Sequence, residues 1–319
     1  MKKLLLVGLR YHKYTAEIIR EIEQQGYEVA YHEIQPRDLY FKTLRVTVPS
    51  AWQASLDRHH RRIIESERGT RYDTVLFIQA HQFSRANMVA LREQQRQARF
   101  VLYNWDAVST HDYRPNMDCF DRVYTFDPDD ARDLGVGYLP LFCIRAFQDL
   151  PRRDQHERAV YFVGNIVSVQ RYEALRAFRA HCEREGIRLR HYMACTPYIY
   201  TRLLRSGHVA TDVRLRPIPE ARFLDMVERS TTVFDFANHR QAGYTMRIAE
   251  NLCAGKKIIT NNARIRHEPF YSEDRILVFE GLDFSGVKDF VNRDLVAPDE
   301  RFEQFHIQTF VRTLLGEVP

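Results

Sequence analysis

The hydrophobic pattern of the first half alternates short apolar runs with amphipathic stretches. The runs at Leu4–Gly8 and Thr74–Ile78 lack polar alternation, as in strands of a parallel sheet covered on both faces. Ile18, Ile19 and Ile22 follow at helical spacing, and Gly26 ends that stretch. The pattern predicts strands at 4–8, 27–34, 74–78, 99–105 and 122–126, and helices at 52–68 and 85–97.

The pattern restarts in the second half. It predicts strands at 159–163, 188–193, 232–236, 257–260 and 275–279, and helices at 172–185, 221–229, 246–253 and 300–315. Strands separated by helices favour right-handed crossovers and a doubly wound sheet. We therefore expect an α/β fold of two Rossmann-like domains, 1–148 and 159–319, with a cleft between them. The polar segment 149–158 is the predicted linker, and we expect the last helix to pack back on the first domain.

Length and composition support this division and limit the function classes. The chain has 319 residues, which suits two domains of about 150 residues each. Its five cysteines include no Cys-x-x-Cys pair, as in a protein of a reducing compartment. The apolar run Leu4–Leu9 is too short for a signal peptide, and no stretch approaches the roughly 20 apolar residues of a membrane helix. We expect a cytoplasmic protein.

A net charge of +5 favours anionic partners. The excess is spread along the chain, and no recognised nucleic-acid-binding motif is present. A nucleotide or a membrane surface therefore explains the charge as well as nucleic acid does, and we predict no nucleic-acid partner.

The segment Gln241–Asn261, QAGYTMRIAENLCAGKKIITN, carries the most chemical information. Gly243 precedes a predicted helix that contains Glu250 and ends at Gly255. A glycine loop at a helix N-terminus lets backbone N–H groups approach a phosphate, and a carboxylate further along can accept hydrogen bonds from ribose hydroxyls. The same spacing is also typical of a plain helix–strand crossover.

This segment resembles the donor site of GT-B glycosyltransferases, in which a glycine loop leads to a helix carrying a Glu, then small residues, a Gly and a strand. The whole chain more closely resembles a GT-B-like family of bacterial polysaccharide biosynthesis, with lipopolysaccharide-core and capsule members and relatives of the spore-maturation protein CgeB. The family usually has Gly-Leu-Thr-Met-Arg where this chain has Gly-Tyr-Thr-Met-Arg. The matching pieces, in order, are VLFIQ (75–79), FVLYNWD (100–106), FDRVYTFDPDDA (120–131), YLPLF (138–142), YFVGN (161–165) with Arg171-Tyr172 downstream, and QAGYTMRIAENLCAGKKIITNN (241–262).

The resemblance implies a nucleoside-diphosphate sugar donor, with phosphate near Arg171 and Arg247 and ribose at Glu250. Common retaining families carry a second Glu eight residues before the ribose Glu, where this chain has Ala242, which puts that retaining chemistry in doubt. GT-B enzymes do not generally need a bound metal, so we expect neither a metal nor another cofactor. The expected donor-binding residues are Gly164, Asn165, Arg171, Gln241, Gly243, Thr245, Met246, Arg247 and Glu250.

Asp106 is the leading candidate for a catalytic base. It follows a predicted strand, and carboxyl ends of parallel strands face the ligand in open α/β sheets. His12, His81 and His111 follow other strands and are rival bases. A helix cap or a loop hydrogen bond is the structural alternative for Asp106, and a place in a surface loop for each histidine. We interpret Asp127, in the run DPDD, as a helix N-cap rather than a metal ligand.

These features predict a glycosyltransferase acting on a glycan or lipid-linked glycan acceptor of the cell envelope. The alternatives are a sugar-nucleotide epimerase of the same fold and a non-catalytic binding or structural protein. The stretch Trp52–Arg68 combines arginines with Trp52, Leu56, Ile63 and Ile64. Such a basic amphipathic helix can rest on an anionic membrane, which would place the protein at the inner face of the membrane; a solvated surface helix is the alternative.

Overall fold

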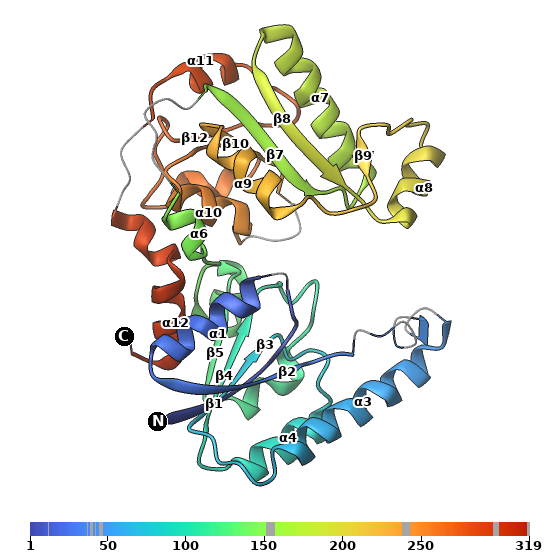
Figure 1. The fold of residues 1–319 in the computed structure, drawn as a ribbon, viewed down its shortest axis with the longest axis vertical. Coiled ribbons are helices and arrows are strands. Elements are labelled where there is room, and N and C mark those ends of the chain that lie inside the picture. Colours follow the sequence, from blue (N-terminus) through green and yellow to red (C-terminus); the bar gives the residue numbers. More distant parts are fainter. Residues whose placement is uncertain are drawn as a thin grey trace. The chain divides into compact units, whose positions relative to one another are not determined.

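The computed structural model describes residues 1–11, 13–36, 38, 41, 43–44, 47–150, 157–237, 243–295 and 300–317. Its contacts divide the chain into two compact units. Unit 1 comprises Met1–Ile144, Arg240–Tyr244 and Gln304–Pro319, and unit 2 comprises Arg145–His239 and Thr245–Glu303. Each unit holds one six-stranded parallel sheet with helices between the strands, so the predicted α/β fold of two Rossmann-like domains is confirmed (Figure 1).

Unit 1 has the strand order β2-β1-β3-β4-β5-β6. Its central strands are almost wholly buried, because helices cover both faces of the sheet; Leu4, Leu5 and Leu6 expose none of their surface. Its strands are β1 (Lys2–Gly8), β2 (Tyr27–Glu33), β3 (Thr74–Ile78), β4 (Arg99–Asn104), β5 (Arg122–Thr125) and β6 (Gly137–Tyr138). Its helices are α1 (Tyr14–Gln24), α3 (Pro49–Ser66), α4 (Arg85–Gln94), the 3-10 helix η1 (Arg114–Cys119) and α5 (Pro128–Leu134).

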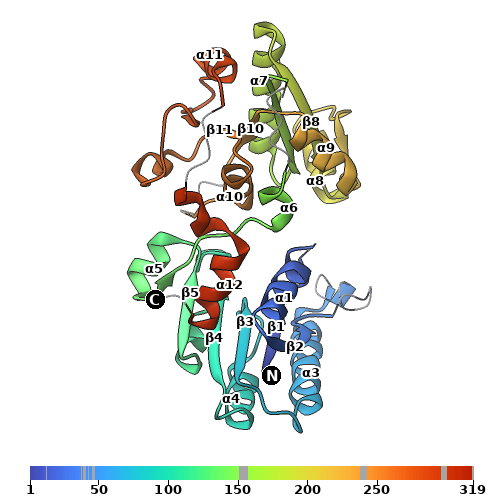
Figure 2. The ribbon, with the colours of Figure 1, turned by 60° about the vertical axis from the view of Figure 1, so that its left-hand side comes forward.

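The C-terminal helix α12 (Ile307–Leu315) packs against α1 within unit 1 (Figure 2). Phe310 supplies the apolar contact, with its ring centroid 4.4 Å from that of Phe142 and 4.8 Å from that of Tyr103. The predicted single helix from Glu300 to Leu315 is wrong in one respect. A 3-10 helix, η3 (Glu300–Phe305), comes first, and His306 is extended because the backbone there pairs with Cys143.

Unit 2 has the strand order β12-β11-β10-β7-β8-β9. Its core is aromatic: the Phe234 ring lies 3.9 Å from that of Phe178 and 5.4 Å from that of Phe279, centroid to centroid. Its strands are β7 (Ala159–Asn165), β8 (Arg188–Ala194), β9 (Val213–Arg214), β10 (Thr232–Asp235), β11 (Lys257–Thr260) and β12 (Ile276–Val278). Its helices are α6 (Arg145–Gln148), α7 (Val169–Glu185), α8 (Pro197–Arg205), α9 (Glu220–Glu228), α10 (Met246–Cys253), the 3-10 helix η2 (Ala263–His267) and α11 (Val287–Asn292).

The unit boundary lies between Ile144 and Arg145, so α6 belongs to unit 2 although the sequence placed it in the first domain. The reason is packing: α6 contacts α10, and Phe147 lies 5.8 Å from Phe223, centroid to centroid. Residues 151–156 of the predicted linker lie outside the described residues. Within the described part of the chain, no helix is both long and apolar enough to span a bilayer.

The apolar residues of helix α3 face the interior of unit 1. Leu56 exposes none of its surface and Ile63 only 3%, while Ile64 is half-buried against the same core. His60 is also fully buried, with its Nε2 atom 2.7 Å from the carbonyl oxygen of Ile34 and its ring stacked on Phe83. The exposed side of the predicted amphipathic helix is therefore charged rather than apolar.

Burial lowers the pKa of His60 from 6.5 to about 4, because the imidazolium ion loses its hydration; the hydrogen bond to Ile34 opposes this shift only in part. Between these two pH values the unfolded chain binds a proton that the folded chain does not. The free energy of unfolding should therefore fall by up to about 3 kcal/mol as the pH drops through this window. His60→Phe keeps the ring stacking and should remove this part of the pH dependence.

Urea unfolding followed by tryptophan fluorescence checks this expectation. Trp52 and Trp105 are the only tryptophans and both lie in unit 1, so the signal reports the unit that contains His60. An equal slope of stability against pH in wild type and His60→Phe would contradict the account.

Candidate functional site

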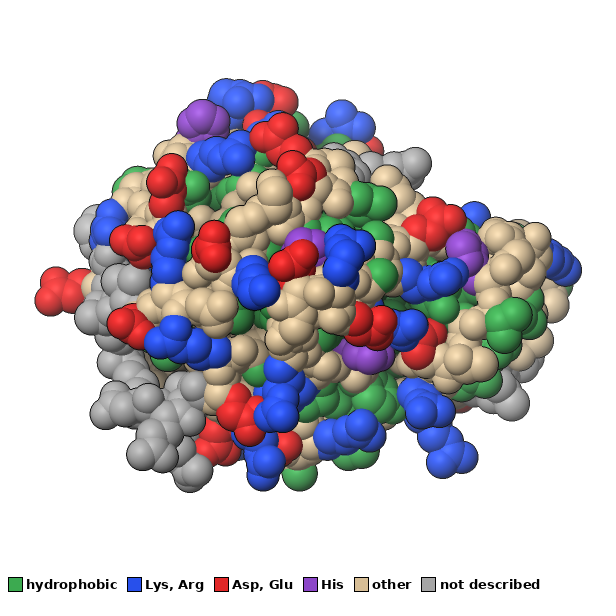
Figure 3. All heavy atoms as spheres, turned by 90° about the horizontal axis from the view of Figure 1, so that it is seen from above, with side chains coloured by type: hydrophobic (Ala, Val, Ile, Leu, Met, Phe, Trp, Pro, Cys, Tyr) green, Lys and Arg blue, Asp and Glu red, His purple; other side chains and the backbone are tan. Residues whose placement is uncertain are grey.

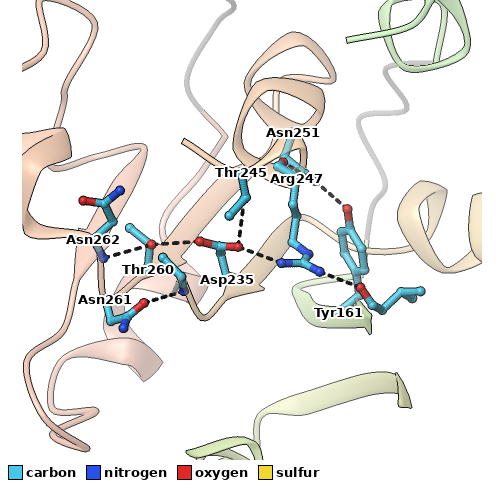
Figure 4. Close-up of polar contacts among 10 residues, drawn as sticks. Tyr161, Asp235, Thr245, Arg247, Asn251, Thr260, Asn261 and Asn262 are labelled. Atoms are coloured by element: carbon cyan, nitrogen blue, oxygen red, sulfur yellow. Dashed lines mark hydrogen bonds and ion pairs between the residues drawn. The ribbon is translucent and has the colours of Figure 1, made fainter. Parts of the chain in front are cut away.

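The candidate site lies at the carboxyl edge of the unit 2 sheet and is organised by Asp235, the last residue of β10. This carboxylate exposes none of its surface. Its Oδ1 atom lies 2.7 Å from Nη1 of Arg247 and accepts a hydrogen bond of 3.0 Å from the Thr245 hydroxyl. Its Oδ2 atom accepts one of 3.1 Å from Thr260, at the end of β11. Figure 4 shows these side chains meeting from two strands and the start of α10.

Arg247 is held on a second side by the end of β7. Its Nη2 atom donates to the carbonyl oxygen of Val163 at 2.8 Å, and its guanidinium lies 5.1 Å from the ring centroid of Phe162. Gly164 follows directly, and a Cβ atom there would lie 2.7 Å from Nη2 of Arg247. A side chain at 164 would therefore displace the guanidinium from its present position.

Arg171, in the first turn of α7, approaches the same ring, with its guanidinium 5.8 Å from the Phe162 centroid. Its Nε atom is buried and has no hydrogen-bond partner among the described residues. Burial and, to a smaller extent, the positive charge of Arg247 together lower the pKa of Arg171 to about 10, while Asp235 acts in the opposite direction. The two guanidinium groups therefore lie beside the same Phe162 ring, while the ion pair with Asp235 is made by Arg247.

Helix α10 connects this network to Glu250. Asn251 receives a hydrogen bond of 2.8 Å from the Tyr161 hydroxyl and donates one of 2.8 Å to the carbonyl oxygen of Arg247 (Figure 4). Burial, more than the nearby Glu250 charge, raises the pKa of Tyr161. Only 4% of Glu250 is exposed, so its carboxylate lies inside unit 2 rather than on an open helix face.

The predicted donor residues therefore fall into separate groups. The structure brings Gly164, Arg171, Thr245 and Arg247 together around Asp235 and Phe162. Asn165 is exposed after them at the end of β7, and Met246 is half-buried at the start of α10. Gln241 lies outside the described residues, as does Ala242.

The surroundings of Gly243 differ from those of the phosphate-binding loop that the sequence predicted. It is buried in unit 1, where an added Cβ would lie 2.4 Å from the Phe126 ring, and its N–H points to Asp127 Oδ2 at 3.4 Å. An acidic partner takes the place that was expected for a phosphate. Asp127 also accepts from the backbone N–H groups of Asp129 and Asp130, which confirms its interpretation as the N-cap of α5.

A second cluster lies at the carboxyl edge of the unit 1 sheet and contains three of the predicted bases, Asp106, His81 and His111. Asp106 follows the end of β4. Its Oδ2 atom lies 3.2 Å from Nδ1 of His111 and accepts a hydrogen bond from the Gln79 side-chain amide. The His111 ring stacks on that of His81 at 4.0 Å. Gln79 has φ of 65°, a conformation that costs energy in a residue with a side chain and that aims its amide at Asp106. His12 lies outside the described residues.

Comparison of the sequence with protein-family models and with curated proteins gives no match. Solved structures do match over the whole length. The apo form of the lipopolysaccharide outer core galactosyltransferase WaaB aligns at 14% identity and a TM-score of 0.55, covering 99% of this chain and 100% of that one. An alpha-glucosyltransferase in complex with UDP and DNA aligns at 11% identity and a TM-score of 0.61, over 99% and 95%. UDP-GlcNAc 2-epimerase from Neisseria meningitidis aligns at 11% identity and 0.56, over 99% of each chain. This similarity establishes the GT-B fold.

The Asp235 network makes a stability prediction. Asp235→Asn should leave Arg247 with an unpaired charge in a site where its side chain is only 16% exposed, and should lower the free energy of unfolding of unit 2 by about 3 kcal/mol. Asp225→Asn is the matched control, because its pair with Arg229 is 53% and 64% exposed, and it should change stability by less than about 1 kcal/mol.

Urea unfolding followed by far-UV circular dichroism measures this change, while tryptophan fluorescence reports unit 1 alone. Equal, small effects of the two substitutions would mean that the network does not organise unit 2.

Proposed function

We propose that this chain transfers a sugar from a nucleoside diphosphate to a glycan acceptor of the cell envelope. The observation that carries the proposal is the pair of guanidinium groups, Arg171 and Arg247, beside the Phe162 ring, where Asp235 forms its ion pair with Arg247 and the Nε atom of Arg171 is unpartnered. A diphosphate would neutralise their excess charge. Solved proteins of the same fold support this choice, since one of them is described in complex with UDP.

The roles of the two arginines differ in this proposal. Arg247 already binds Asp235 and Val163, so it fixes the shape and charge of the site. Arg171 keeps an unpartnered Nε atom and is the stronger phosphate ligand. The N-terminus of α10 adds the positive end of a helix dipole. Glu250 remains the proposed ribose ligand, and its burial means that the nucleotide must reach it beside α10.

The transfer is a substitution at the anomeric carbon. An acceptor hydroxyl oxygen forms the new bond to this carbon, the bond to the diphosphate oxygen breaks, and the hydroxyl proton passes to a base. Negative charge grows on the departing diphosphate, so fixed positive charge stabilises the transition state more than the ground state. This reaction class needs no redox cofactor, and the proposal includes no metal.

We assign the proton acceptor to the unit 1 cluster. Asp106 can accept the proton itself or orient His111 to accept it, as a carboxylate orients a catalytic imidazole elsewhere. Tyr11 and Trp105 lie at the same sheet edge with ring centroids 5.7 Å apart, and such rings provide flat apolar surfaces beside the base. His81 contacts His111 by stacking and is a positioning residue in this scheme.

An epimerase is the second candidate, because an UDP-GlcNAc 2-epimerase shares the fold. The two activities separate in one assay. An epimerase converts the free sugar nucleotide without an acceptor, whereas a transferase releases the nucleoside diphosphate.

The proposal places the protein in the cytoplasm, at the inner membrane face where its acceptor is lipid-linked. The apolar side of α3 is buried, so a contact through 52–68 would use only exposed arginines such as Arg58, Arg61 and Arg62 and would add little to membrane binding.

Nucleotide binding tests the donor site. Arg171→Gln should weaken UDP binding by about 10- to 100-fold, the effect of losing hydrogen bonds to a charged group. Arg176→Gln, an exposed position on the same helix, should leave affinity unchanged. Titration calorimetry with UDP measures both. A wild-type protein that binds neither UDP nor any other nucleoside diphosphate would contradict the proposed function.

Turnover tests the base. Asp106→Asn and His111→Gln should each slow sugar transfer by about 10²- to 10⁴-fold while leaving UDP affinity unchanged, since they lie in unit 1 and the proposed nucleotide site lies in unit 2. Loss of UDP affinity in either variant would instead indicate a structural role, and full activity would remove this assignment.

A further inference from the structure

Unit 2 carries an exposed apolar surface at the sheet edge formed by α8 and β9. Tyr198, Leu204, Val209 and Leu215 are 67%, 47%, 78% and 56% exposed. In the rest of the described chain, exposed large hydrophobic side chains are scattered singly. Four within one short segment therefore need an explanation.

The segment is well anchored, so this exposure is not a sign of poor packing. Thr196 caps α8 by accepting from the backbone N–H of Ile199 at 3.3 Å, and Leu203 is fully buried in the core. Gly207, with φ of 80°, reverses the chain, and β9 then pairs with the end of β8. Leu204, next to Leu203, points away from the core because neighbouring residues of a helix lie on different faces.

The same surface is positively charged. Arg202, Arg205, Arg214 and Arg216 are all exposed. Asp212 is the only acidic residue from 196 to 219, and it is already paired with Arg179 at 2.6 Å and hydrogen-bonded to Tyr172. Figure 3 views the molecule from the side on which unit 2 lies, and acidic and basic side chains are interspersed over much of this face.

We propose that this α8–β9 surface, residues 198–216, docks on the surface of an anionic lipid bilayer. Guanidinium groups would bind lipid phosphates while Leu204, Val209 and Leu215 enter the apolar boundary and Tyr198 lies at the headgroup level. The inference does not rest on the proposed sugar transfer.

A bilayer fits these residues better than a protein or nucleic acid. The apolar side chains are spread over a helix, a turn and the residue after an edge strand, so a partner protein would need a shape complementary to all three. Nucleic acid would satisfy the arginines but would leave Leu204, Val209 and Leu215 without apolar contacts. A lipid surface accommodates both kinds of side chain without a matched shape.

Helix α3 provides a matched control within the same chain. Arg61 and Arg62 are exposed neighbours there, but the apolar residues of α3 are buried. Replacing these two arginines changes the net charge by the same amount as replacing Arg202 and Arg205. Any difference between the two double variants therefore reports the α8–β9 surface and not total charge.

The test is flotation of the full chain with vesicles of phosphatidylcholine alone or mixed equally with phosphatidylglycerol. Wild type should float only with the mixed vesicles. Arg202→Gln with Arg205→Gln should weaken this binding about 30-fold, taking about 1 kcal/mol per arginine and tenfold per 1.4 kcal/mol. Leu204→Ser with Leu215→Ser should weaken it at least about tenfold. Arg61→Gln with Arg62→Gln should have little effect.

Three results would overturn the proposal: negligible binding of wild type to both vesicles, equal losses in the two arginine double variants, or unchanged binding in the leucine double variant. Melting temperatures check that all variants are folded, which is expected because every substituted side chain is exposed.

Discussion

A single buried carboxylate determines the arrangement of the candidate site. Asp235 has no exposed surface, so its charge must be compensated inside unit 2. Arg247 in α10 forms an ion pair with it, and the hydroxyl groups of Thr245, just before α10, and Thr260, at the end of β11, donate hydrogen bonds to it. The ion pair fixes the start of α10 against two strand ends, and the second bond of Arg247, to Val163, adds the end of β7. Gly164, Phe162 and Arg171 are then packed around a guanidinium that cannot move freely.

This constraint changes the roles that the sequence suggested. Arg247 was expected to meet phosphate directly, but its Nη1 and Nη2 atoms already bond to Asp235 and Val163 inside the protein. The charge of Arg171 remains, because the ion pair of Asp235 is with Arg247 and the Nε atom of Arg171 has no partner among the described residues. The proposed function therefore makes Arg171 the ligand of the anion. The carboxyl edge of the unit 1 sheet carries different groups, a carboxylate (Asp106) beside the two stacked imidazole rings of His81 and His111.

The sequence was a good guide to the fold because strands buried on both faces have largely apolar runs, as in Thr74–Ile78. It was weaker where tertiary contacts decide the outcome. Asp235 was counted only as part of a strand, although an acidic residue ending the run TVFD was a usable signal. Lys257 was assigned only to a strand, yet its Nζ donates to the carbonyl oxygens of Phe290, Val291 and Arg293 at the end of α11. Helix α8 was missed because it spans only Pro197–Arg205.

The most direct test of the central claim compares the affinities of uridine, UMP and UDP for the wild-type protein by titration calorimetry. In the proposed function, the positive charge around Arg171 and Arg247 binds the phosphates of the nucleotide. Affinity should therefore rise from uridine to UMP to UDP, and the gain should weaken as ionic strength increases. Equal affinity for uridine and UDP, or binding of UDP that is insensitive to salt, would contradict it.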